Sequence, residues 1–153
     1  LQKYSVHVAT KYYKAPELLV NAQTYDYSID IWSVGVLFLE ALTLNIHVFD
    51  SDDNEDMIAS IAQVLGSHDI LQWINKYRIK ISRAKKQQIG DYPKVPFENL
   101  FPRNREKFKD PVAIDLLNHL LVIDHKNRMT AAEALDHPFF VPVKLVDEQR
   151  AKK

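Results

Sequence analysis

The sequence predicts an all-α protein, and three observations support this fold class. Residues 27–44 form an apolar stretch that is too long for a strand. Residues 57–65 and 111–121 carry apolar side chains at helical spacing. Residues 130–133 read T-A-A-E, a capping box that marks the start of a helix. We therefore expect a buried central helix, formed by residues 27–44, with several other helices packed around it.

The central helix is expected to begin with Ser28 as its N-cap. Its apolar residues lie on nearly every face, which predicts a helix that is buried all round. A membrane span is excluded because Asp30 and Glu40 interrupt the stretch. Two interpretations of Asp30 are open. It lies exposed in the first turn, where it favours the helix dipole, or it anchors a separate loop through backbone amides.

Composition limits the classes of protein that fit. The chain has 153 residues, of which 46% are apolar, enough for one domain with a core. Zero formal net charge gives no reason to expect bulk attraction to nucleic acid or to a membrane. The absence of cysteine excludes disulfides and thiolate metal sites and suits a reducing compartment. An acidic cluster at residues 50–56 and a basic cluster at residues 76–86 are predicted to be solvated faces that could attract one another.

The first half of the chain has clear start and stop signals around the central helix. Residues 1–10 are expected to be extended or loop, and Pro16 can open a short helix. The helix at 57–65 should stop at Gly66. A further short helix should follow, capped by Ser67 or Asp69.

The second half is predicted to be less regular. Residues 77–102 hold three prolines and are expected to form a long, partly ordered insertion. Pro111 should open an amphipathic helix, and residues 124–128 should form a turn. The helix that starts at the capping box should end at His137-Pro138, and residues 147–153 should be frayed.

Four sequence blocks, taken in order, resemble the C-terminal lobe of eukaryotic Ser/Thr protein kinases. They are V-A-T-K-Y-Y-K-A-P-E at 8–17, D-I-W-S-V-G at 30–35, D-H-K-N-R-M-T at 124–130 and E-A-L-D-H-P-F-F at 133–140. Within that family the chain looks most similar to the casein kinase II catalytic subunit. That similarity rests on residues 4–9, 25–28, 64–66, Tyr77 and Asp124-His125. Positions 7, 11, 15 and 48 depart from that subunit, and residues 79–109 match it poorly.

The resemblance implies a domain organisation. Residues 1–143 would be the C-terminal, peptide-binding part of a kinase domain, starting within the activation segment, and residues 144–153 would be a charged tail. The Gly-rich loop, the phosphate-binding lysine and the H-R-D and D-F-G elements of phosphoryl transfer are absent from the sequence. No catalytic residue and no metal ligand is therefore expected in this chain, and ATP and Mg²⁺ would be bound only by the complete kinase. The chain alone should transfer no phosphate and should expose an apolar patch.

The resemblance also assigns roles to individual residues. Glu17 would pair with Arg128, and Asp30 and Trp32 would give structural support. Thr10 would bond the catalytic loop, while Lys11 and Lys14, with His7 more weakly, would attract acidic residues of a peptide substrate. The plain alternatives are surface charges, an ordinary strand threonine and solubilising lysines.

Two functions follow as expectations. The chain is part of a Ser/Thr kinase that prefers acidic sites, or it is a non-catalytic helical docking module or pseudokinase-like fragment. The expected partners are acidic protein or peptide substrates, the missing N-terminal part of the kinase and a regulatory subunit, with no nucleic acid and no membrane. The expected location is cytoplasmic, nuclear or both.

Overall fold

The structure, a computed structural model, describes residues 11–20, 22, 26–51 and 56–151. These described residues contain helices and no strands, so the predicted all-α fold class is confirmed. The elements are η1 (Lys11–Tyr13), α1 (Pro16–Leu19), α2 (Ser28–Thr43), α3 (Met57–Leu65), α4 (Ser67–Lys76), α5 (Arg83–Ile89), η2 (Phe97–Leu100), η3 (Arg103–Phe108), α6 (Pro111–Leu120), α7 (Ala131–Asp136), η4 (Pro138–Phe140) and α8 (Val141–Ala151). Within the described part of the chain, no helix is long and apolar enough to span a bilayer.

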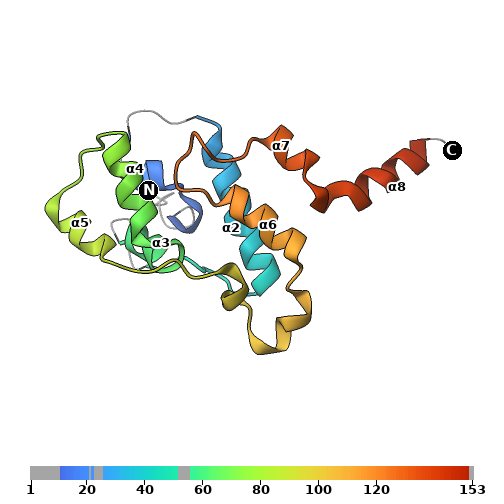
Figure 1. Cartoon of the computed structure of the whole chain (residues 1–153), viewed down its shortest axis with the longest axis horizontal. Helices are drawn as coiled ribbons and strands as arrows, with labels where there is room; N and C mark the ends of the chain where they lie inside the picture. The colour runs from blue at the N-terminus through green and yellow to red at the C-terminus, as the bar shows by residue number, and fades with distance from the viewer. Residues whose placement is uncertain (1–10, 21, 23–25, 52–55, 152–153) are drawn as a thin grey trace, which may run out of the picture.

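Helix α2 lies at the centre and packs along α6 (Figure 1). Trp32, Val36 and Leu39 on its inner face are fully buried. Gly35 permits the close approach, because a Cβ added there would lie 2.8 Å from Cδ2 of Leu121. The central helix predicted from the sequence is therefore present and carries much of the core.

The prediction that α2 is buried all round is wrong. Val34 and Leu37 are each 52% exposed, and Leu44 at the C-cap is 66% exposed. Because η1 and α6 pack on α2 from its inner side, the opposite stripe has no cover among the described residues. The expected exposed apolar patch is therefore found, and we call Val34, Leu37 and Leu44 the outer stripe of α2.

The predicted N-cap of α2 is also wrong. The helix begins at Ser28, and the Ser28 backbone N–H donates to the Asp26 carboxylate at 3.0 Å. The Ser28 hydroxyl is buried without a hydrogen-bond partner. A carboxylate two residues upstream therefore takes the capping role that the hydroxyl was expected to have.

The expected insertion at 77–102 is more ordered than predicted. It contains α5 and η2, and α5 packs on α3 with Ile89 fully buried. The Ser67 hydroxyl donates to the Ile89 carbonyl at 2.7 Å and accepts from the Tyr92 N–H at 2.9 Å. Neither Ser67 nor Asp69 caps α4, because Gly66 is its N-cap and the Ser67 hydroxyl holds this segment instead. Such contacts between distant residues were not visible in the local sequence.

Most of the other predicted boundaries are confirmed. Pro16 opens α1, Pro111 opens α6, and the T-A-A-E capping box forms both of its hydrogen bonds. The predicted frayed end is wrong as far as residue 151, because α8 is continuous from Val141 to Ala151 and projects from the body (Figure 1). It passes through the expected boundary between residues 143 and 144 without a break.

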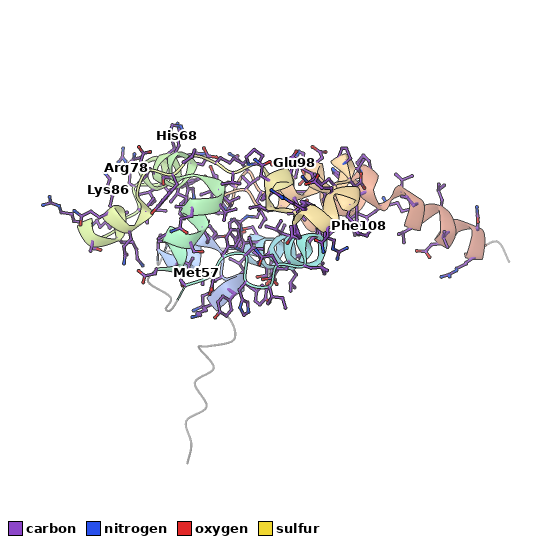
Figure 2. All side chains as sticks on the ribbon, turned by 90° about the horizontal axis from the view of Figure 1, so that it is seen from below. Met57, His68, Arg78, Lys86, Glu98 and Phe108 are labelled. Carbon is purple, nitrogen blue, oxygen red and sulfur yellow. The ribbon has the colours of Figure 1, made fainter. Side chains whose placement is uncertain are left out.

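The charged clusters are only partly described. Arg78 and Lys86 of the basic cluster are exposed at the α4–α5 end, as expected for a solvated face (Figure 2). Lys76 and Lys85 depart from that expectation, because Lys76 pairs with Asp124 at 2.6 Å and the half-buried Lys85 donates to the Leu19 carbonyl at 2.9 Å. Most of the acidic cluster, and the predicted extended segment at 1–10, lie outside the described residues.

Candidate functional site

The segment from Lys11 to Val20 is a short wall built on α2. Pro16 restricts Ala15 to extended backbone, with φ −67° and ψ 151°, so the chain turns sharply from η1 into α1. The Ser33 hydroxyl of α2 donates to the Tyr13 carbonyl at 2.9 Å and fixes η1 on the central helix. Glu17 in the first turn of α1 points inward and is fully buried.

Glu17 forms a two-pronged ion pair with Arg128. Nη1 of Arg128 lies 2.8 Å from Oε1 of Glu17, and Nη2 lies 3.1 Å from Oε2. Both side chains are completely buried. The pair joins residues 111 positions apart in the sequence, so the pairing predicted for them is confirmed.

Arg128 uses every N–H donor of its guanidinium group. Besides the two bonds to Glu17, Nη1 donates to the Ser28 carbonyl at 2.7 Å, Nε to Val122 at 3.0 Å and Nη2 to Ile123 at 3.4 Å. A planar fork with five donors suits this set, whereas lysine offers three. The side chain therefore ties α1, the start of α2 and the turn after α6 to one point.

Trp32 completes this buried centre. Its ring lies 5.1 Å from the Arg128 guanidinium carbon and stacks on Phe49, with 6.0 Å between ring centroids. The position of the guanidinium over the Trp32 ring allows a cation–π attraction in this buried site. Trp32 thus packs against the buried ion pair.

Asp30 lies at the edge of the same region, in the exposed first turn of α2. Within the described residues its carboxylate has no hydrogen-bond partner. It lines a mostly apolar cavity of about 480 Å³ between the start of α2 and the turn that carries Arg128. Of the two interpretations that the sequence left open for Asp30, the structure shows the exposed one, and the carboxylate is accessible to solvent.

A sequence model described as the protein kinase domain matches residues 1–140 of the chain. The chain belongs to the protein kinase domain family. The match includes the wall, the buried ion pair and the central helix, so the coarse assignment made from the four sequence blocks is confirmed.

The four substrate-binding residues expected from the kinase resemblance differ in burial, and two of them lie outside the described residues. Lys11 is only 8% exposed, and its Nζ donates to the Ser51 carbonyl at 2.7 Å. This inward placement gives no support to a role in attracting substrate. Lys14 is half-buried on the wall. His7 and Thr10 lie outside the described residues, so their roles stay predictions.

Glu40 is a supporting residue whose role the sequence analysis missed. It is 9% exposed, accepts from the Tyr13 hydroxyl at 3.2 Å and accepts from the His47 N–H at 2.7 Å. Burial raises the Tyr13 pKa, and the Glu40 charge and hydrogen bond raise it further. The His47 ring stacks on Tyr12 with 3.7 Å between centroids. A carboxylate inside an apolar helix was the available signal for this second anchor of η1.

Protein kinases generally use ATP and Mg²⁺, but the glycines of this sequence form no Gly-rich phosphate-binding motif. Its three glycines are Gly35, Gly66 and Gly90. Gly35 serves the packing of α2, while Gly66 and Gly90 end α3 and α5 with φ of 88° and 64°. None belongs to a loop that could cradle phosphates. We assign no step of phosphoryl transfer to these residues.

Proposed function

We propose that this chain is the peptide-binding half of a Ser/Thr protein kinase that resembles casein kinase II and prefers acidic sites. The observation that carries the proposal is the buried Glu17–Arg128 pair, which fixes the wall of residues 11–20 on the central helix within a chain of the kinase family. The role of the wall is to position a protein or peptide substrate. The nucleotide site and the catalytic base would come from residues that precede Leu1.

The exposed face of α2 supports this arrangement. The outer stripe is apolar and solvent-exposed, and Asp30 beside it has an accessible carboxylate at a cavity. Burying such a stripe is favourable by about 25 cal/mol for each Å² of apolar surface. The preceding half of the kinase domain would cover the stripe, and one of its loops would donate backbone N–H groups to Asp30.

The proposed preference for acidic peptides is assigned to Lys14, because the kinase resemblance places this cation on the substrate wall. Lys11 is engaged with Ser51, and His7 would contribute only when protonated, near or below its usual pKa of about 6.5. We include a regulatory subunit among the proposed partners, and a cytoplasmic or nuclear location. These two proposals rest on the resemblance to casein kinase II.

The second candidate is a non-catalytic module that docks acidic peptides. It would use the half-buried Lys14 on the wall to hold the acidic peptide. Both candidates use the same wall, so peptide binding alone does not separate them.

The test starts from the transcript that encodes Leu1, whose upstream sequence is read and expressed together with these residues. A radiolabelled-ATP assay then compares the 153-residue chain with the longer chain on a serine peptide flanked by aspartate and on its alanine-flanked control. We expect transfer by the longer chain only, with the acidic peptide preferred. A start codon directly before Leu1 would favour the docking module, and phosphate transfer by the 153 residues alone would overturn the proposal.

The Lys14→Glu variant of the longer chain tests the acid preference, with Lys144→Glu as the matched control on the exposed helix α8, which projects from the body. We expect Lys14→Glu to raise KM for the acidic peptide and leave the alanine-flanked peptide unchanged. Equal effects of the two variants would remove Lys14 from the proposed substrate contact.

A further inference from the structure

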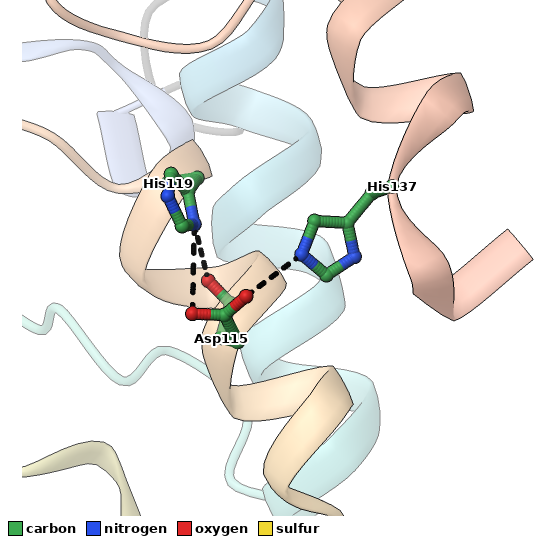
Figure 3. A group of neighbouring side chains, drawn as sticks. All are labelled: Asp115, His119 and His137. Atoms are coloured by element: carbon green, nitrogen blue, oxygen red, sulfur yellow. Dashed lines mark hydrogen bonds and ion pairs between the residues drawn. The ribbon is translucent and has the colours of Figure 1, made fainter.

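Three side chains with metal-binding atoms meet where α6 faces the start of η4 (Figure 3). Asp115 and His119 lie one turn apart on α6, and His137 precedes η4. One ligand atom from each lies within 4.8 Å of the other two. Nε2 of His137 is 3.0 Å from Oδ2 of Asp115, and Nδ1 of His119 is 3.9 Å from Oδ1.

The positions of these side chains are fixed by the fold. Residues four apart on a helix share a face, which places Asp115 beside His119. Helix α6 packs against η4, and the Phe139 ring of η4 contacts Phe38 of α2 with centroids 5.1 Å apart. His137 is therefore held at 6% side-chain exposure, while Asp115 and His119 are 60% and 51% exposed. The group therefore has one ligand, His137, fixed by packing, and two exposed ligands, Asp115 and His119, on a side that an ion can reach from solvent.

We propose that Asp115, His119 and His137 bind one divalent transition-metal ion, with Zn²⁺ the best match. Two imidazoles and a carboxylate are ligands that Zn²⁺ accepts, and Zn²⁺ imposes no geometry of its own beyond a preference for four ligands. Metal–ligand distances of about 2.0–2.2 Å in a tetrahedral site separate ligand atoms by roughly 3.3 Å. The His137–Asp115 separation is already close to that value. Nδ1 of the exposed His119 ring donates to the Asp115 backbone carbonyl at 2.8 Å, so the ring must release that hydrogen bond and rotate to join. Water would fill the fourth position.

Binding must shift a proton within each imidazole ring. In His119 the Nδ1–H bond to the Asp115 carbonyl breaks, the metal–Nδ1 bond forms, and the proton moves to Nε2 through solvent. The Phe139 N–H donates to Nδ1 of His137 at 3.2 Å, so the neutral ring carries its proton on Nε2, facing Asp115. When the metal binds, the Nε2–H bond breaks, the metal–Nε2 bond forms, and the proton moves to Nδ1 through solvent. Nδ1 can then no longer accept from Phe139. Metal binding is therefore coupled to loss of that hydrogen bond, and the Phe139 amide reports it.

The same residues have a plain alternative role without metal. The Asp115–His137 hydrogen bond alone joins α6 to the end of α7, and it needs no ion. The alternative predicts no saturable binding of metal and no dependence of metal binding on His119.

The test titrates the full 153-residue chain with Zn²⁺ against a chromophoric chelator and repeats the titration with Co²⁺, whose visible spectrum reports coordination. We expect one ion per chain, an affinity lower by about tenfold or more in His119→Ala and in Asp115→Asn, and no change in His68→Ala, an exposed histidine on α4. Circular dichroism checks that each variant keeps its helix content. Hydrogen exchange at the Phe139 amide should quicken when Zn²⁺ is added.

The proposal is overturned by the absence of one-to-one binding, by equal affinities of His119→Ala and His68→Ala, or by a Phe139 amide that does not respond to Zn²⁺. Transfer of phosphate has no part in these measurements, so the result is independent of the proposed kinase function.

Discussion

Two cations on one turn, Lys126 and Arg128, form ion pairs of equal length, but one pair is exposed to solvent and the other is buried. Lys126 lies 2.8 Å from Asp26, with side chains 56% and 44% exposed. Arg128 lies 2.8 Å from Glu17, and both side chains are completely buried. Each pair joins segments about 100 residues apart, so distance and sequence separation do not tell them apart. Burial decides how much stability is lost when a pair is broken, because a buried charge that loses its partner has no water to replace it.

Breaking the buried pair is the largest effect that this comparison predicts. Arg128→Met leaves the Glu17 carboxylate buried and unpaired, and removes the ties to Ser28, Val122 and Ile123. We expect a loss of about 3–5 kcal/mol in the free energy of unfolding, measured by urea denaturation. Glu17→Gln combined with Arg128→Met should cost less than the sum of the single changes. A loss below about 1 kcal/mol in Arg128→Met would contradict the structural role of the pair.

A substitution that keeps the positive charge of Arg128 but replaces its planar guanidinium group separates the effect of charge from that of hydrogen-bond geometry. Arg128→Lys offers three donors in place of five and cannot form the fork, so it should leave carbonyls of the α2 start and the following turn unpaired. We expect a loss of about 2–3 kcal/mol, smaller than that of Arg128→Met. The measurement is again urea denaturation, and full stability in Arg128→Lys would show that charge alone is sufficient.

The capping box that follows this turn ranks next. The Thr130 hydroxyl accepts from the Glu133 N–H, and Glu133 returns a bond to the Thr130 N–H at 2.8 Å. Thr130→Ala should lower the free energy of unfolding by about 1 kcal/mol. Thr130→Ser keeps the cap and serves as the matched control. A thermal melt that shows both variants equal would exclude the capping contribution.

The exposed pair gives the smallest effect and depends on pH. The hydrogen bond from Lys126, with help from the Ser28 backbone N–H, holds the pKa of the Asp26 carboxyl well below its usual range. Because the folded pKa is lower than the unfolded value of about 3.9, the pair stabilises the fold above that pH and stops doing so as pH falls further. Lys126→Met should therefore differ slightly from the parent chain at pH 7, and the difference should shrink below pH 4 and in high salt. A difference that persists in strong salt and acid would mean that packing, and not charge, explains the effect.

Much of the fold was predictable from local sequence. Pro16 and Pro111 open helices because proline lacks the N–H that a first helical position does not use, and Gly66 ends α3 with a positive φ. The Glu17–Arg128 pair was predicted from sequence blocks shared with kinases, and the structure confirms it. These features depend on residue type at fixed short spacing, or on a family pattern.

Other features were mispredicted because they depend on contacts between distant segments. Residues 77–102 looked irregular, yet Ile89 finds a buried place against α3. Lys11 looked like a surface cation, and it reaches the Ser51 carbonyl. Ser28 looked like a cap, but the Asp26 carboxylate is better placed.

The sequence by itself determined where α1, α6 and α7 begin and where α3 ends, because proline, capping and helical spacing act over a few residues. Tertiary structure alone decided which face of α2 is covered, which of two neighbouring cations is buried, and that His137 meets Asp115 and His119. Those outcomes depend on the desolvation of each side chain, which is set by the segments that pack against it and not by its neighbours in the chain.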